Sequence, residues 1–354
     1  VLVAALATLP FMYHPAPAQE PAGAGRMRAV MLVAATEVIE PGYARFLEAA
    51  RRSSVATDEL CTAPGRRKLD AARAAFSATA LAWARVENIR FGPVMSGNRL
   101  ERVLFWPDRK SIGLRQVQAL LATKDRTATD AGTLVGKSVA VQGLGALEFV
   151  LFGTGSTALA DQDGFRCDYA SAIARNLVAI AGELTRAWRD PNSALSAWLP
   201  GEGPGRETEM LNELVGALVH GLESIRDIRL RGFLGDTPGQ DRPRVALFRR
   251  SGNTVPMIAA GIDGLRALFV DSGMESLLPD SNRSIGESIR FEFAQLLDLA
   301  SLLDRPVAEL LADEQARQRL VLLDLVMDSL IDRIDGQYAP AAGLAAGFSF
   351  SDGD

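Results

Sequence analysis

"IARNLVAIAGELTRAW", residues 173–188, carries the pattern that decides the fold class. Its large apolar residues recur every three or four positions, at Ile173, Leu177, Ile180, Leu184 and Trp188. This spacing places them on one face of a helix, because an α-helix has 3.6 residues per turn. The segment therefore predicts an amphipathic helix that packs one face against a core.

The same helical spacing recurs in three other long segments, and no comparable stretch alternates with period two. These segments carry Leu69, Phe76 and Trp83; Leu211, Leu214, Leu218, Leu222 and Ile225; and Leu320, Leu323, Met327, Leu330 and Ile334. The fold class is therefore predicted to be all-α.

Proline and glycine are concentrated near residues 190–205, between two halves of similar size. Such a stretch predicts a boundary between two packed helical bundles, residues 19–195 and 200–354. A second irregular stretch, residues 231–256, is dense in Gly, Pro and Arg. Because it also contains apolar residues, we expect an ordered loop, and ordered loops of this length are commonly functional.

The composition narrows the class of protein. The chain has 354 residues, of which 48% are hydrophobic and 23% charged, and its formal net charge is −5. This balance predicts a globular protein rather than a disordered one. No stripe of Lys and Arg is interleaved with aromatic residues, so nucleic acid is excluded as an expected partner. The chain has no long uncharged apolar stretch, so we do not expect a membrane-embedded protein.

The N-terminal residues resemble a secretory signal. A short apolar run is followed by Ala16-Pro17-Ala18, which has the small-x-small form of a signal-peptidase site. Residues 1–18 are therefore predicted to be a cleaved signal peptide, and the mature protein to be periplasmic. In an oxidising compartment, Cys61 and Cys167 are expected to form a disulfide, the alternative being two separate buried thiols.

The stretch "VQGLGALEFVLFG", residues 141–153, is apolar or glycine except at Gln142 and Glu148. As a helix it has no polar face, so Glu148 must be paired, hydrogen-bonded, protonated or bound to a cation. Gly143 and Gly145 weaken a helix, which is tolerated where a backbone or a ligand comes close. Two interpretations stay open: a structural ion pair with an arginine, or a ligand site.

Residues 83–110 combine many charges with aromatic residues, and Gly92-Pro93 is expected to break the helix there. Arg90, beside this break, is the predicted partner of Glu148. Asp108, after Trp106-Pro107, is able to cap the following helix. Solvated helix faces are the alternative for most of these charges.

The stretch "RRSGNT", residues 249–254, offers Arg249, Arg250, Ser251, Asn253 and Thr254 beside a glycine. Guanidinium and hydroxyl groups in this arrangement are able to bind an anion, and the alternative is a polar turn before a capped helix. His220 and Glu223 also form an HxxE pattern, but they lie opposite the apolar stripe of their helix. We therefore expect them on a solvated polar face.

Five stretches together resemble the imelysin family over essentially the whole mature chain: "RVENIRFGP", "FWPDRK", "GLGALEFVLFG", "LFRRSGNT" and "GFSFSDGD". The resemblance implies two helical bundles, a cleft between them and a link to bacterial iron uptake. The family's GxHxxE motif falls on Gly143, Gly145 and Glu148. Gly145 stands at the histidine position, so one metal ligand is missing.

The resemblance predicts an exported binding protein for iron or another metal, free or as a chelate or other small ligand. The expected ligand-binding residues are Glu148, also the candidate metal ligand, Gly143, Gly145, Arg90, Asp108, Arg249, Ser251 and Asn253. A metallopeptidase is the alternative, disfavoured because it needs about three protein ligands. The third reading is an interaction module for an outer-membrane or periplasmic redox partner.

Overall fold

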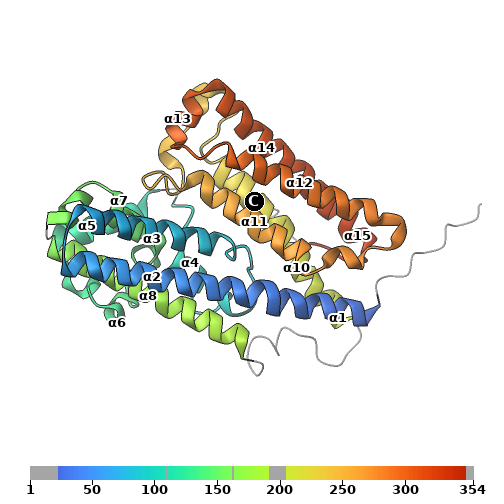
Figure 1. Cartoon of the computed structure of the whole chain (residues 1–354), viewed down its shortest axis with the longest axis horizontal. Coiled ribbons are helices and arrows are strands. Elements are labelled where there is room, and N and C mark those ends of the chain that lie inside the picture. The colour runs from blue at the N-terminus through green and yellow to red at the C-terminus, as the bar shows by residue number, and fades with distance from the viewer. Residues whose placement is uncertain (1–22, 109, 162, 191–204, 348–354) are drawn as a thin grey trace, which may run out of the picture.

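The computed structural model describes residues 23–108, 110–161, 163–190 and 205–347 (Figure 1). These residues form helices and connecting turns without a β-strand, which confirms the predicted all-α class. The predicted signal peptide, residues 1–18, and the predicted boundary between residues 195 and 200 lie outside the described ranges. Within those ranges, no helix is both long and apolar enough to cross a bilayer.

The α-helices before the Pro- and Gly-rich stretch are α1 (Ala24–Val33), α2 (Glu40–Thr62), α3 (Arg66–Ala84), α4 (Arg99–Val103), α5 (Ile112–Thr123), α6 (Ala131–Leu134), α7 (Leu144–Phe152) and α8 (Gly164–Arg189). Those after it are α10 (Arg206–Glu223), α11 (Thr254–Val270), α12 (Arg283–Ser301), α13 (Val307–Ala312), α14 (Glu314–Arg333) and α15 (Ala339–Ala341). The predicted apolar segments fall on α3, α8, α10 and α14.

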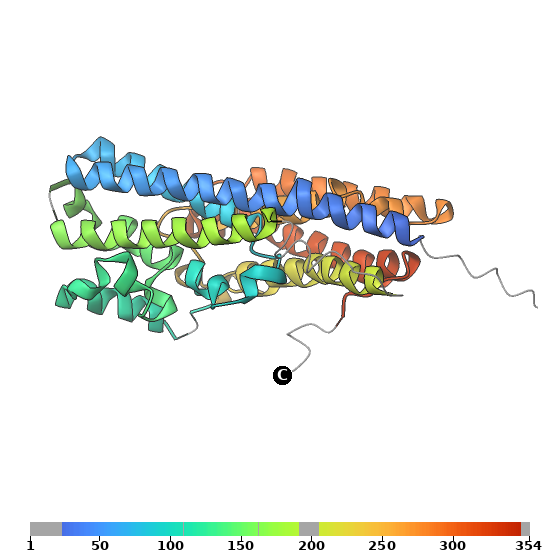
Figure 2. The same cartoon turned by 90° about the horizontal axis from the view of Figure 1, so that it is seen from below.

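Three π-helical segments extend α-helices without a break: Ala34–Ile39, Ser224–Leu230 and Ile334–Tyr338. The first joins α1 to α2, so that these elements run along the length of the molecule (Figure 2). The start of α1 reaches the C-terminal helices, where Arg28 pairs with Glu207 of α10 at 3.1 Å. Short π-helical segments are common near functional sites, and the second one borders the pocket described below.

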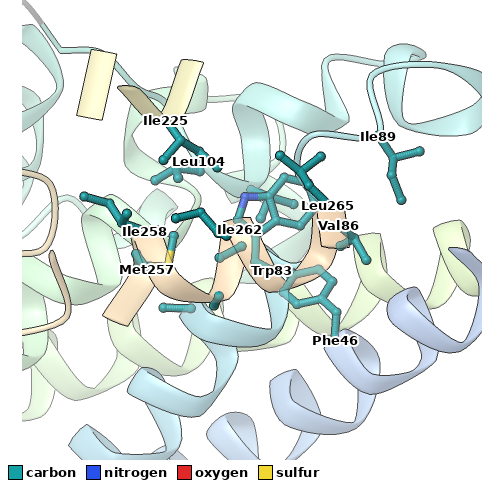
Figure 3. Packing of buried hydrophobic residues seen from close by; sticks show 14 of the residues in the cluster. Phe46, Trp83, Val86, Ile89, Leu104, Ile225, Met257, Ile258, Ile262 and Leu265 are labelled. Carbon is teal, nitrogen blue, oxygen red and sulfur yellow. The ribbon is translucent and has the colours of Figure 1, made fainter. Parts of the chain in front are cut away.

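The N-terminal and C-terminal helices share apolar packing where α3 meets α11. Phe46 of α2 contacts Trp83 of α3, with ring centroids 5.2 Å apart. Ile258 and Ile262 of α11 belong to the same buried cluster (Figure 3). This contact fixes how the elements around the pocket sit relative to one another, because closely packed interiors resist deformation.

The expected disulfide joins the two longest N-terminal helices. Cys61, near the end of α2, is bonded to Cys167 of α8, and their Cα atoms lie 5.5 Å apart. This confirms the pairing and excludes the alternative of two free thiols.

The helix expected to end at Gly92-Pro93 ends earlier, at Ala84. A turn follows, in which the carbonyl of Trp83 accepts hydrogen bonds from the backbone N–H groups of Val86 and Glu87. Glu87 is buried and paired with Arg229 of the second π-helical segment. The turn after α3 therefore carries a buried ion pair to the C-terminal half, which the local pattern does not reveal.

Candidate functional site

The site is built on α7, which contains Glu148. Most of α7 is buried, but Gly145 is exposed and Phe152 half-buried. A Cβ atom added at Gly145 would meet no atom within 4 Å outside its own helix backbone. A Cβ added at Gly143, the residue before the helix, would overlap the carbonyl oxygens of Arg102 and Val103. Gly143 thus permits close backbone packing, whereas Gly145 leaves open space.

Gln142, the other polar residue of this stretch, fixes the start of α7. Its side-chain amide donates to the carbonyls of Lys137 at 2.6 Å and Val135 at 3.2 Å. Its side-chain oxygen accepts from Arg102 Nε at 3.1 Å, and its backbone carbonyl accepts from Asn176. Gln142 is therefore a satisfied structural residue, which leaves Glu148 as the candidate functional one.

Glu148 is 4% exposed and is bound by the 249–254 stretch of the C-terminal half. Its Oε1 accepts hydrogen bonds from the backbone N–H groups of Arg250 and Ser251, both at 3.0 Å, and from Ser251 Oγ at 3.1 Å. Arg250 Nη1 lies 3.7 Å from Oε2. The carboxylate therefore connects α7 to a loop about a hundred residues later in the chain.

Arg90, the predicted partner of Glu148, does not contact it. Arg90 lies in the turn after α3, where the charges on Glu87 and Arg229 act on it. The prediction was wrong because it assumed that a helix continues to Gly92. The partner is Arg250, which the sequence placed among the possible anion-binding groups of its loop but not as the partner of Glu148.

Burial is the main cause of the pKa shifts of Glu148 and Arg250. It raises the pKa of Glu148 above the ordinary 4.5, although the hydrogen bonds from Ser251 and the charge on Arg250 oppose this shift. Burial also lowers the pKa of Arg250; the positive charge of Arg249 adds to this effect and Glu148 opposes it. The Arg250 guanidinium lies over the Phe149 ring, 5.2 Å from its centroid.

A pocket of about 550 Å³ opens beside this ion pair, within the range typical of small-molecule sites. Its walls come from residues 104–108, α5, α7, the π-helical segment Ser224–Leu230 and the loop from Arg242 to Arg250. Trp106, Phe149 and Leu114 contribute apolar surface, and Arg242, Arg244 and Arg249 are exposed arginines of the walls. Residues from both halves of the chain therefore form one pocket.

The eight predicted ligand-binding residues divide into two groups. The pocket walls include Gly145, Glu148, Asp108 and Arg249, but not Gly143, Ser251, Asn253 or Arg90. Ser251 supports Glu148 from outside the lining, and Asn253 donates to Ser77 Oγ at 2.8 Å. Asp108 also caps α5 as expected, since it accepts from the N–H groups of Ile112 and Leu114.

Sequence reasoning missed Arg242 and Arg244 of the pocket wall. The only signal was the high arginine content of residues 231–256, which could not show which side chains face the pocket. His220 was expected on a solvated face, but it is half-buried and contacts Glu223 at 3.0 Å and the Ala346 carbonyl at 3.2 Å. His220 therefore contacts the C-terminal segment at Ala346 instead of facing only solvent.

The residues present do not fit the metal centre that the resemblance implies. Within the described ranges, no group of three or more His, Cys, Asp or Glu side chains could hold a metal ion. Oε1 of Glu148 already accepts three hydrogen bonds, and a histidine at position 145 is replaced by glycine. A transition metal bound by side chains needs more donors than Glu148 supplies.

Solved structures with a similar fold include two proteins. An imelysin-like protein from Psychrobacter arcticum 273-4 matches with a TM-score of 0.77 and 20% identity, over 92% of this chain and 98% of that one. A "putative iron-regulated protein A precursor" from Parabacteroides distasonis ATCC 8503 matches with a TM-score of 0.73 and 13% identity, over 92% and 99%. No curated protein sequence matches the chain. The sequence pattern of the imelysin family matches residues 39–333, and the chain belongs to this family.

Proposed function

We propose that this chain is an exported binding protein that acts in iron or metal acquisition and holds a small ligand in the pocket beside Glu148. Family membership and the iron-regulated precursor among the similar structures support the role in acquisition. The signal-like residues before residue 19 support export, and the proposed compartment is the periplasm.

The observation that carries the proposal is the convergence of three sequence stretches on one pocket. "FWPDRK", "GLGALEFVLFG" and "LFRRSGNT" are far apart in the chain, yet each contributes residues to the same walls. The carboxylate of Glu148 connects two of them directly. Packing alone requires no open pocket of this size between these stretches, so we assign the space to a ligand.

The test is native mass spectrometry of the protein purified from the cells that produce it, grown with limited iron. We expect the wild type to retain a small ligand. Gly145→Trp fills the pocket without a clash at Cβ and should abolish retention. Gly164→Trp is the matched control: Gly164 begins α8, does not line the pocket and has equally open space at Cβ. It should retain the ligand.

A growth experiment tests the biological role. A strain that lacks the gene should grow poorly under iron limitation, and wild type or Gly164→Trp, but not Gly145→Trp, should restore growth. Full rescue by a folded Gly145→Trp would contradict the proposed use of the pocket. Chelator-sensitive cleavage of a denatured protein substrate would instead support the metallopeptidase.

A further inference from the structure

We infer that the pocket selects a small anion that presents carboxylate or phosphate groups, so that any metal enters as a negatively charged complex. This inference rests on the proposed function, because it specifies the ligand class of the same pocket. Its basis is that the carboxylates in the walls already have interaction partners, whereas most of the arginines there have no carboxylate partner.

The three carboxylates in the walls already have partners. Asp108 accepts two backbone hydrogen bonds at the start of α5. Glu148 accepts three hydrogen bonds and lies near Arg250. Asp227 is paired with Arg226 at 2.8 Å and with Arg231 at 3.2 Å. Each of these carboxylates is therefore already held by hydrogen-bond donors or by an arginine.

The arginines in the walls differ from the carboxylates in this respect. Within the described ranges, Arg242, Arg244 and Arg249 have no carboxylate within ion-pair distance, and only Arg250 lies near one, Glu148. Arg249 Nε donates to the Arg244 carbonyl at 2.9 Å, which brings these two residues of the loop together. The walls thus contain three guanidinium groups without a compensating carboxylate.

These guanidinium groups oppose binding of a free cation. A metal ion beside Glu148 would face Arg250 near Oε2 and the further positive charges of Arg249 and Arg244. Like charges in a partly enclosed site repel one another more strongly than in bulk water. Carboxylate or phosphate groups would instead relieve this repulsion and accept paired hydrogen bonds from the guanidinium forks.

The apolar residues and Arg250 set how an anion would meet the arginines. Trp106, Phe149 and Leu114 add apolar surface to the pocket, whereas Arg242, Arg244 and Arg249 are exposed at its rim. Because these three arginines are exposed, salt screens their attraction for an anion, and anion affinity should fall as ionic strength rises. The contact between Arg250 and Phe149 fixes one guanidinium before the ligand arrives.

The test is isothermal titration calorimetry at low ionic strength with pairs of probes that differ in charge. Propane-1,2,3-tricarboxylate should bind, whereas its triamide, which has the same skeleton without charge, should give no detectable heat. Titrations with inorganic phosphate and with ferric citrate show whether the pocket prefers phosphate or a metal carboxylate complex. Cobalt(II) chloride tests a bare cation, which should not bind with a one-to-one stoichiometry.

The decisive variant is Arg244→Gln/Arg249→Gln, which removes two of the uncompensated charges. Tricarboxylate affinity should fall at least about tenfold, because each charge-assisted contact contributes more than a neutral one. Arg51→Gln/Arg67→Gln is the matched control: both residues are exposed, lie outside the pocket and change the net charge equally. It should alter affinity less than about twofold. Thermal unfolding confirms that both variants fold.

Three outcomes would overturn the inference. One is binding of the triamide as strong as that of the tricarboxylate. Another is stoichiometric cobalt binding that depends on Glu148 and strengthens in the arginine variant. The third is the absence of heat with every anionic probe. In each case the proposed function fails only if native mass spectrometry also finds no ligand dependent on the pocket.

Discussion

Glu148 is the residue on which the site depends. It is buried on a helix that has no other charged side chain, and it binds the backbone of a loop from the other half of the chain. A buried carboxylate is stable only when such donors compensate its lost hydration. The same contacts orient Arg250, so one residue both joins the halves and shapes the pocket wall.

Glu148→Ala should therefore destabilise the protein. The substitution leaves the N–H groups of Arg250 and Ser251 and the Arg250 charge without their acceptor. We expect the free energy of unfolding to fall by about 3 kcal/mol, as for other buried pairs that lose one partner. Urea denaturation measures this loss, and a change within experimental error would contradict the role assigned to Glu148.

The difference in stability between Glu148→Gln and wild type should depend on pH. Because burial raises the folded-state pKa of Glu148 above 4.5, the folded protein binds this proton more tightly than the unfolded chain. Protonation of Glu148 therefore stabilises the folded state below pH 4.5, and this stabilisation is lost as the pH rises through the folded-state pKa. Glutamine does not titrate, so the stability of Glu148→Gln relative to wild type should rise over this window. Denaturation at pH 4 to 8 measures it, and a constant difference would refute the shift.

At this scale the sequence predicts the need for a partner but not its identity. An acid in an apolar stretch requires donors, and this follows from Glu148 and its neighbours alone. Arg90 follows α3, which ends at Ala84, whereas Arg250 reaches Glu148 from a loop about a hundred residues later in the chain. Such distant pairs leave no local pattern in the sequence.

The helix α7 shows how two neighbouring glycines serve different purposes. The sequence predicts the helix and assigns both glycines to a close approach by a backbone or a ligand. In the structure, Gly143 lies outside the helix against α4, and Gly145 lies in its first turn beside the pocket. The sequence could not separate the two roles, since α4 is brought to Gly143 by tertiary packing.

Alanine at these two positions should have opposite effects. Gly143→Ala forces the backbone of α4 away and should destabilise the protein by about 2 kcal/mol, as expected for overpacking. Gly145→Ala meets open space and should stabilise it by up to about 1 kcal/mol through helix propensity. Thermal and urea denaturation of both variants provide the comparison. Equal effects would contradict the assignment of the two glycines.

For the whole molecule, periodicity is sufficient to predict the helical class and the long helices, because each buries one continuous apolar face. The pocket is less predictable. Its walls come from segments separated by more than a hundred residues, and only the order of family-like stretches indicated that they belong together. Arg242 and Arg244 show this most clearly, since their place in the wall depends on how the loop passes over α7.

The disulfide should contribute to the stability of the whole fold. Cys61 and Cys167 are 106 positions apart, so their bond restricts a long loop of the unfolded chain. Cys61→Ala/Cys167→Ala should lower the free energy of unfolding by about 4 kcal/mol, according to the chain-entropy estimate. Urea denaturation of the variant and of oxidised wild type measures the effect. A loss below about 1 kcal/mol would contradict it.

The central claim, that an anion binds beside Glu148, is tested most directly by a crystal structure of the protein soaked in propane-1,2,3-tricarboxylate. The account predicts density for the tricarboxylate in the pocket, with its carboxylates against Arg244 and Arg249 and with Glu148 still bound to the loop. An empty pocket at a saturating concentration, or a metal ion bound to Glu148 in place of the anion, would contradict it.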